Sequence, residues 1–512
     1  MHTHDMHGAA RHLLSRYAGK GLTKTAGALA TTALVIATSA TPALAATTAQ
    51  VGIGTTTYQQ IDGFGFSDAF GQVGNLEAMP ASVQSDVLNL LFSPTTGAGL
   101  DIVRFGLGES AADGGAGNLS DQEWLGQQAE SFGVHTFYGD AWSAPGAFKT
   151  NGSQDNGGYL CGVPGETCTA GDFRQAYADY LASEAEAFAA AGVPLEAVDF
   201  VNEPEIGPGY ASMEMTPAQA ADFVPFLGRA LQEQGLRTSV ACCDAEGWAN
   251  ATGFDGAQAY TQAVLSDPQS ARYIGLITSH GYTSAPTFPL TNERPVWETE
   301  WSTFQKWDSA WNDGTSASGL SWADRIYTAL TAANVNAFLY WWGTTTYREN
   351  GDNEGLVILG SSSDPTADAY QASGRLWAFG AFSRFVRPGA LRLAATSSDP
   401  NLDAVAFRNG QETVLVLINN NSSDEQVQVS LPHRDFAGFT SSALPYLTDA
   451  SNNGTAEQPI ALTNGSFSTT VPAGAVVSYV IGGPGSQGGP GSQGGPGSQG
   501  GPGSQGGPGS QG

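Results

Sequence analysis

Eight short apolar segments, each followed by a stretch with helical spacing of its apolar residues, constrain the fold of this chain more than any other feature. Strands that alternate with helices in this way predict a parallel sheet, and eight repeats favour a closed (β/α)8 barrel of the α/β class. A doubly wound open sheet is the alternative, but no glycine-rich phosphate loop follows the first segment. The predicted strands cover residues 61–66, 100–106, 136–142, 198–202, 239–243, 274–280, 296–301 and 337–342.

The pattern changes after Pro388, where short strand-like segments are separated by clusters of Asn, Ser, Asp and Gly. These segments predict a small antiparallel β-domain over residues 388–481, beside a barrel over residues 59–387. Residues 46–58 have a similar character and are expected to pair with the β-domain. Its predicted strands cover residues 405–407, 413–418, 427–429, 467–471 and 476–480.

Both ends of the chain differ from the rest. Residues 1–45 combine basic residues, an apolar run over 26–37 and a small-residue cleavage site, which predicts a secretory signal peptide and an extracellular protein. A membrane anchor is the alternative, but the run is shorter than the roughly 18 residues that a span needs. Residues 482–512 repeat Gly-Gly-Pro-Gly-Ser-Gln and predict a flexible linker or tail.

Charge limits the possible binding partners, and the cysteines limit the possible disulfides and metal sites. The 48 acidic and 20 basic side chains give a formal net charge of −28, which disfavours nucleic acid and anionic membrane surfaces as partners. In an oxidising compartment, Cys161 and Cys168 are disulfide candidates. The adjacent Cys242 and Cys243 are either buried thiols or a bridge. Neither pair has further His or Cys residues at zinc-ligand spacing, so no metal is expected.

Carboxylates, amides and aromatic rings follow the predicted strands at their C-terminal ends, where such a barrel carries its active site. Glu203 follows the fourth strand and Glu300 ends the seventh, so the two are expected to face each other across the barrel mouth. Two carboxylates are what glycosidic cleavage requires, one as acid/base and one as nucleophile or base. Glu205 lies two residues from Glu203, and Glu298 two residues from Glu300, so in a strand each pair would point to the same face. Position along the strand only weakly favours Glu203 and Glu300 over these neighbours.

Longer motifs resemble a known family. Asn-Glu-Pro at 202–204 and Thr-Glu-Trp at 299–301 resemble the acid/base and nucleophile motifs of retaining glycosidases with (β/α)8 barrels. The segments 62–67, 140–146 and 279–282 resemble glycoside hydrolase family 30. Within that family, residues 149–152, the loop from Cys161 to Cys168, the Cys242-Cys243 pair and residues 297–301 are similar to a xylanase subfamily known mainly from fungi. The resemblance covers residues 50–481 and implies a barrel with an attached antiparallel β-sandwich side domain.

The resemblance also implies roles for individual residues. Glu203 would be the acid/base and Glu300 the nucleophile, acting with retention and without a cofactor. The residues expected to surround them are Arg104, paired with a carboxylate of the site; Trp142 and Trp342, under the attacked sugar; Asn202 and His280, in contact with substrate; and Tyr282, hydrogen-bonded to the nucleophile.

The expected substrate is a plant cell-wall polysaccharide of the xylan type, cut internally or with release of xylobiose by a monomeric enzyme. No Arg follows Phe70 where some similar xylanases bind glucuronate, which favours a neutral backbone. The alternatives are an endo-β-1,6-galactanase, a β-glucosidase or glucosylceramidase-like enzyme, and, from another class, a non-catalytic carbohydrate-binding protein.

Overall fold

The computed structural model describes residues 48–108, 119–304, 307–347, 354–361, 363–432 and 442–482. The predicted signal peptide (1–45) and all but the first residue of the predicted tail (482–512) lie outside the described residues. Within the described ranges, no helix is both long enough and apolar enough to cross a membrane.

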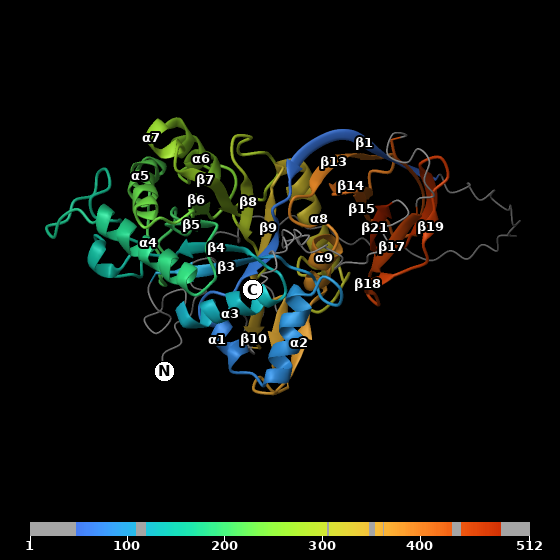
Figure 1. The fold of residues 1–512 in the computed structure, drawn as a ribbon, viewed down its shortest axis with the longest axis horizontal. Coiled ribbons are helices and arrows are strands. Elements are labelled where there is room, and N and C mark those ends of the chain that lie inside the picture. The colour runs from blue at the N-terminus through green and yellow to red at the C-terminus, as the bar shows by residue number, and fades with distance from the viewer. Residues whose placement is uncertain are drawn as a thin grey trace, which may run out of the picture.

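Eight parallel strands close into a barrel in chain order, which confirms the predicted fold class (Figure 1). The fourth strand ends at Asp199 and not at Asn202, because the Asp199 carboxylate accepts hydrogen bonds from the amides of the next two residues and turns the chain. The barrel strands are β2 (Gly63–Ser67), β3 (Ile102–Leu107), β4 (Thr136–Ala141), β5 (Ala197–Asp199), β6 (Ser239–Ala245), β7 (Ile274–His280), β8 (Val296–Glu300) and β9 (Ala337–Trp342).

Helices pack around the barrel, and their apolar faces form one continuous core with the outward-facing side chains of the strands. The start of α5 shows how sequence sets a helix end: Thr216 and Gln219 form a capping box, and Pro217 occupies the first helical position. The helices are α1 (Gln72–Glu77), α2 (Ala81–Phe92), α3 (Leu119–Ser131), α4 (Arg174–Ala190), α5 (Pro217–Glu233), α6 (Ala257–Ser266), α7 (Pro268–Ala271), α8 (Gly319–Thr328) and α9 (Gly374–Ser383).

Three short strands form a small separate sheet that the sequence pattern did not predict. They are β10 (Thr344–Thr346), β11 (Val357–Leu359) and β12 (Tyr370–Ala372), and β11 lies in the middle. The hydroxyl of Tyr370 donates to Asp86 at 3.1 Å and ties this sheet to α2.

The side domain contains one hydrogen-bonded path of strands that folds into two layers. Phe467 on β20 and Tyr479 on β21 are 5.4 Å apart between ring centroids, although these strands do not neighbour each other in the path. The order is β18-β17-β21-β15-β14-β13-β1-β16-β20, with β19 paired to β17. The strands are β1 (Ala49–Gln60), β13 (Leu391–Ser397), β14 (Leu402–Asn409), β15 (Glu412–Asn419), β16 (Glu425–Ser430), β17 (Ser442–Thr448), β18 (Asn453–Ala456), β19 (Ile460–Ala461), β20 (Ser466–Val471) and β21 (Val476–Gly482).

One pairing in this domain departs from the antiparallel expectation. Strand β1 is antiparallel to β13 but parallel to β16. Because β1 comes from the other end of the chain, no hairpin fixes its direction relative to β16. Figure 1 shows β1 in blue, arching from the barrel to the orange and red strands of the side domain.

Helix α9 lies between the barrel and the side domain (Figure 1). On the side-domain side, the Ser478 hydroxyl donates to the carbonyl of Ala381 at 2.5 Å, and the ring of Tyr446 lies 4.5 Å from that of Phe385. The Trp311 indole donates to the carbonyl of Gly474 at 2.7 Å. These buried contacts hold the two domains together as one packed unit.

Candidate active site

The two candidate carboxylates reach the barrel mouth in different ways. Glu300 is the last residue of β8, whereas Glu203 lies four residues beyond β5 in a turn. Glu203 has φ 45°, a left-handed conformation that costs energy for a residue with a side chain. Its amide donates to the carbonyl of Asp244 at 2.9 Å, which fixes the turn against β6.

His280, the last residue of β7, lies between these carboxylates. Its Nδ1 is 3.0 Å from Oε1 of Glu203, and its Nε2 is 3.8 Å from Oε2 of Glu300. Burial lowers the pKa of His280, but the carboxylates of Glu300, Asp244 and Glu203 outweigh burial and raise the pKa well above its usual value. The surrounding carboxylates thus favour the protonated ring, in which Nδ1–H donates to Glu203. One ligand atom from each of the three side chains lies within 4.8 Å of the others, so the two carboxylates are close neighbours.

Arg104 on β3 forms the centre of the floor of the site and is completely buried. Its guanidinium donates to Oε2 of Glu300 at 2.5 Å, to Oδ2 of Asp140 at 2.7 Å and to Oδ1 of Asn202 at 2.8 Å. A further bond of 3.1 Å reaches Asp244. Arg104 thus pairs with carboxylates, and Asn202 holds the guanidinium through its carbonyl oxygen.

Three buried aspartates near the two glutamates, Asp140, Asp199 and Asp244, have pKa values that are shifted in different directions. Burial raises the pKa of Asp199 to about 8, and burial with the nearby charge of Asp244 raises the pKa of Asp140 well above its usual range. For Asp244, burial also acts to raise the pKa, but Arg104 and His280 outweigh it and hold the pKa below its ordinary value. Arg104 and His280 thus favour the ionised form of Asp244, whereas burial favours the protonated forms of Asp140 and Asp199.

Tyr282 bonds the oxygen of Glu300 that Arg104 does not bond. Its hydroxyl donates to Oε1 of Glu300 at 2.9 Å. Gly281 makes this placement possible, because a Cβ at that position would lie 2.3 Å from the ring of Trp301. Burial raises the pKa of Glu300, while His280 and Arg104 act to lower it. Both oxygens of Glu300 thus accept bonds that fix the direction of the carboxylate.

Aromatic rings line the other side of the guanidinium. Trp142 lies under Arg104 at 4.6 Å and is 5.8 Å from Trp341. Trp342 is buried and stacks on Trp341 at 4.8 Å. The structure therefore places Trp142 at the site and adds Trp341, with Trp342 stacked on that second ring. Phe70 packs edge-on against Trp142 at 5.3 Å and widens the aromatic cluster.

The two competing glutamates are placed differently from Glu203 and Glu300. Glu298 lies two residues before Glu300 in β8 and is completely buried. Burial raises the pKa of Glu298 well above the usual range. Glu205 accepts a bond from the amide of Glu246 at 3.3 Å in the loop beyond the turn.

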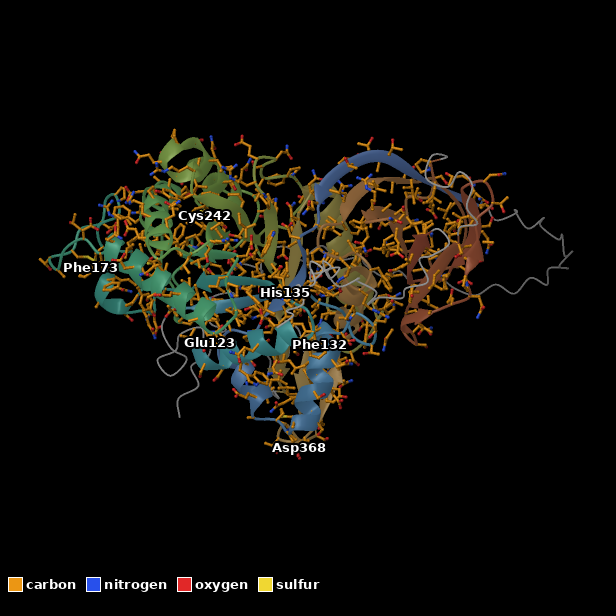
Figure 2. The ribbon with its side chains drawn as sticks, in the orientation of Figure 1. Glu123, Phe132, His135, Phe173, Cys242 and Asp368 are labelled. Carbon is orange, nitrogen blue, oxygen red and sulfur yellow. A yellow bond between two sulfur atoms is a disulfide. The ribbon has the colours of Figure 1, made fainter. Side chains whose placement is uncertain are left out.

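Both cysteine pairs are disulfides. Cys161 and Cys168 are bonded, as expected, and close a short loop before α4. The adjacent Cys242 and Cys243 on β6 are also bonded, which decides between the two alternatives that the sequence left open. Figure 2 shows Cys242 in the green part of the barrel wall, away from Phe173 at the edge of the molecule.

Some residues of the site were missed by sequence reasoning. Asp140 and Asp244 stood at predicted strand ends, but nothing in the sequence showed that both would pair with Arg104. Ser302 donates to the buried carboxylate of Glu354, beyond Tyr282, and no sequence signal connects these distant positions. Trp341 had the same signal as Trp342, since both end the eighth strand.

Two triads have the spacing of metal ligands, namely Glu203 with His280 and Glu300, and Asp140 with Asp199 and Asp244. In the first triad, Nδ1 of the imidazole is already hydrogen-bonded to Glu203, and the raised pKa of His280 favours the protonated ring, which cannot bind a metal. In the second, protein donors occupy the carboxylates: Arg104 bonds Asp140 and Asp244, and Thr278 bonds Asp199 at 2.7 Å. We therefore assign neither triad to a metal, and the absence of a metal from the reaction stays an expectation.

An eight-stranded barrel with two adjacent carboxylates at its mouth has the arrangement that cleavage of a glycosidic bond requires. Family comparisons agree: residues 111–357 match the O-glycosyl hydrolase family 30 model, and residues 389–446 match the family 30 β-sandwich domain model. The chain belongs to glycoside hydrolase family 30, as its sequence motifs predicted.

Individual relatives have different activities. The solved catalytic domain of a family 30 xylanase C from Talaromyces cellulolyticus is 37% identical, with a TM-score of 0.75, covering 84% of this chain and 99% of that one. An endo-1,6-β-D-glucanase of Aspergillus fumigatus is 26% identical, with 73% of this chain and 81% of that protein covered. A lysosomal acid glucosylceramidase of Mus musculus is 27% identical, but the match spans only 59% of either protein.

Proposed function

We propose that this chain is a retaining β-1,4-xylanase in which Glu203 is the acid/base and Glu300 the nucleophile. The observation that carries the mechanism is the spacing of the two carboxylates, whose nearest ligand oxygens lie within 4.8 Å. Retaining glycosidases hold their carboxyl groups about 5 Å apart, whereas inverting enzymes leave roughly 6.5–9.5 Å for a water molecule.

In the first step, Glu300 attacks the anomeric carbon while Glu203 protonates the leaving oxygen. His280 donates to Oε1 of Glu203, so the transferable proton belongs on Oε2. Tyr282 and Arg104 keep Glu300 oriented and ionised before attack. The Glu300 ester then carries no charge, and Glu203 takes a proton from the water that releases the sugar.

The xylan assignment is supported by the similarity to xylanase C, which covers almost all of that catalytic domain. The fungal endo-1,6-β-D-glucanase, matched over 81% of its length, favours β-1,6-glucan as the second candidate. Hydrolysis of β-1,6-galactan and of β-glucosides remains the further alternative from the sequence motifs. Secretion through residues 1–45, action on plant cell walls and a monomeric state are part of the same proposal.

Substrate choice is tested by incubating the protein with beechwood xylan, arabinoxylan, β-1,6-glucan, β-1,6-galactan and an aryl β-glucoside. Reducing ends and product sizes should show cleavage of both xylans. Proton NMR of the first products should show the β-anomer before mutarotation. Cleavage of β-1,6-glucan alone would contradict the xylan assignment but leave the proposed mechanism standing. A first product in the α-anomer would contradict retention.

The two roles are tested by Glu203→Ala and Glu300→Ala, with the exposed Glu77→Ala as the matched control. Each site variant should stay folded and lose most turnover, by a factor on the order of 10² or more. On an activated aryl glycoside, azide should partly restore Glu203→Ala through a β-glycosyl azide. Normal turnover in either variant would remove that residue from the mechanism.

A further inference from the structure

One aromatic ring lies open to solvent directly beside the site. Phe304 follows β8 by four residues and is 67% exposed. Its ring stacks on Tyr282, with centroids 5.6 Å apart and planes inclined by 23°. Since Tyr282 donates to Glu300, Phe304 is separated from the proposed nucleophile by one side chain.

Phe304 differs from the other large apolar side chains that the described residues expose, Tyr58 and Tyr370. Tyr58 is covered by the guanidinium of Arg392 at 4.0 Å, and the hydroxyl of Tyr370 is bonded to Asp86. Phe304 has no polar atom of its own, and its one stacked neighbour within the described part of the chain is Tyr282. A ring held flat against a second ring offers its other face outward as a rigid apolar surface.

We propose that Phe304 forms a sugar-binding subsite on which a neutral pyranose ring of the substrate chain stacks, next to the sugar that Glu300 attacks. Pyranose rings carry one face of C–H groups, which suits the electron-rich face of an aromatic ring. The acidic protein, with a net charge of −28, also favours an uncharged sugar over an anionic one here. This subsite rests on the proposed role of Glu300 and not on which linkage is cleaved.

The subsite has a consequence for kinetics. A substrate long enough to reach Phe304 gains binding from the ring, whereas a glycoside with a single sugar does not. If stacking is worth roughly 0.5–1.5 kcal/mol, its loss raises KM for long substrates by about two- to twelve-fold. The same loss leaves kcat nearly unchanged, provided that Tyr282 stays in place.

The test compares Phe304→Ala, the ring-conserving Phe304→Trp, and Tyr370→Ala as a control for loss of an exposed ring elsewhere. Each is assayed on an aryl β-xyloside and on unlabelled xylo-oligosaccharides of increasing length. If the substrate panel shows that the wild type cleaves β-1,6-glucan, the corresponding gluco-oligosaccharides and aryl glucoside replace them. A wrong substrate assignment is therefore detected before the subsite is tested.

Phe304→Ala should raise KM for the longer oligosaccharides and lose little on the aryl glycoside, whereas Phe304→Trp and Tyr370→Ala should resemble the wild type. An equal loss on all substrates would show that Phe304 only supports Tyr282 and would overturn the proposal. Unchanged KM on every oligosaccharide would overturn it as well.

Discussion

The hydroxyl of Tyr282 gives the sharpest test of how this site controls its nucleophile. Tyr282→Phe removes the bond to Oε1 of Glu300 and keeps the ring that stacks on Phe304. The lost bond stabilises the ionised carboxylate, so its removal raises the pKa of Glu300 above an already raised value. The acid limb of the profile of kcat/KM against pH should therefore move to higher pH.

The size of this shift follows from the burial of the pair. A hydrogen bond to a charged group contributes about 1.5–3 kcal/mol, and one pKa unit corresponds to about 1.4 kcal/mol. Glu300 is only 5% exposed, so solvent screens this bond little. The expected shift is thus about one to two pH units. Arg104 and His280 still face Glu300 in the variant and keep the carboxylate able to ionise.

The assay measures initial rates on a soluble substrate across the pH range, with Tyr370→Phe as a control that loses a hydroxyl elsewhere. Activity of Tyr282→Phe should recover toward the wild-type rate as pH rises past the shifted limb. A variant that loses activity equally at every pH, with its acid limb unmoved, would refute the reasoning.

Two further predictions concern stability. Asp68 is buried and accepts hydrogen bonds from Thr344, and burial raises its pKa to about 7. Because the carboxyl ionises at lower pH in the unfolded chain than in the native state, the free energy of unfolding should fall by up to about 4 kcal/mol as the pH rises from 4 to 8. In urea titrations, Asp68→Asn should therefore lose less stability than the wild type as the pH rises. The same pH dependence in the variant and the wild type would contradict this explanation. Replacing Cys161 and Cys168 by Ser opens a loop with a sequence separation of 7, which should lower the free energy of unfolding by about 2 kcal/mol. An unchanged urea midpoint would show that native contacts alone hold the loop.

The barrel could be predicted because buried strands leave a continuous apolar signal. Seven of its strands fall within a few residues of the expected bounds. Strand β5 is shorter, because the amides of Phe200 and Val201 donate to the Asp199 carboxylate, which no sequence pattern reveals. In the side domain, β13, β17, β18 and β19 were missed. Strand β18, Asn-Gly-Thr-Ala, has almost no apolar residue, and pairing with β17 alone determines that it is extended.

The site was predictable in its residue types but not in its bonding. Motifs brought Glu203, His280, Tyr282 and Glu300 together, and the structure places all four in one connected cluster. The arrangement around Arg104 could not be foreseen, because its partners come from four different strands or turns and depend on exact side-chain directions. The left-handed backbone at Glu203 likewise has no sequence signal, since glycine would be the usual residue there.

Because of the position of β1, the side domain can complete its sheet only when synthesis of the chain is nearly finished. This strand leaves the ribosome before any barrel strand, yet its two neighbours, β13 and β16, are among the later segments of the chain. Until they emerge, β1 has both edges unpaired and is open to association with other chains. A shortened chain that stops at the barrel would keep that exposed ribbon permanently, so deletion of the side domain should give an aggregating product and not a smaller enzyme.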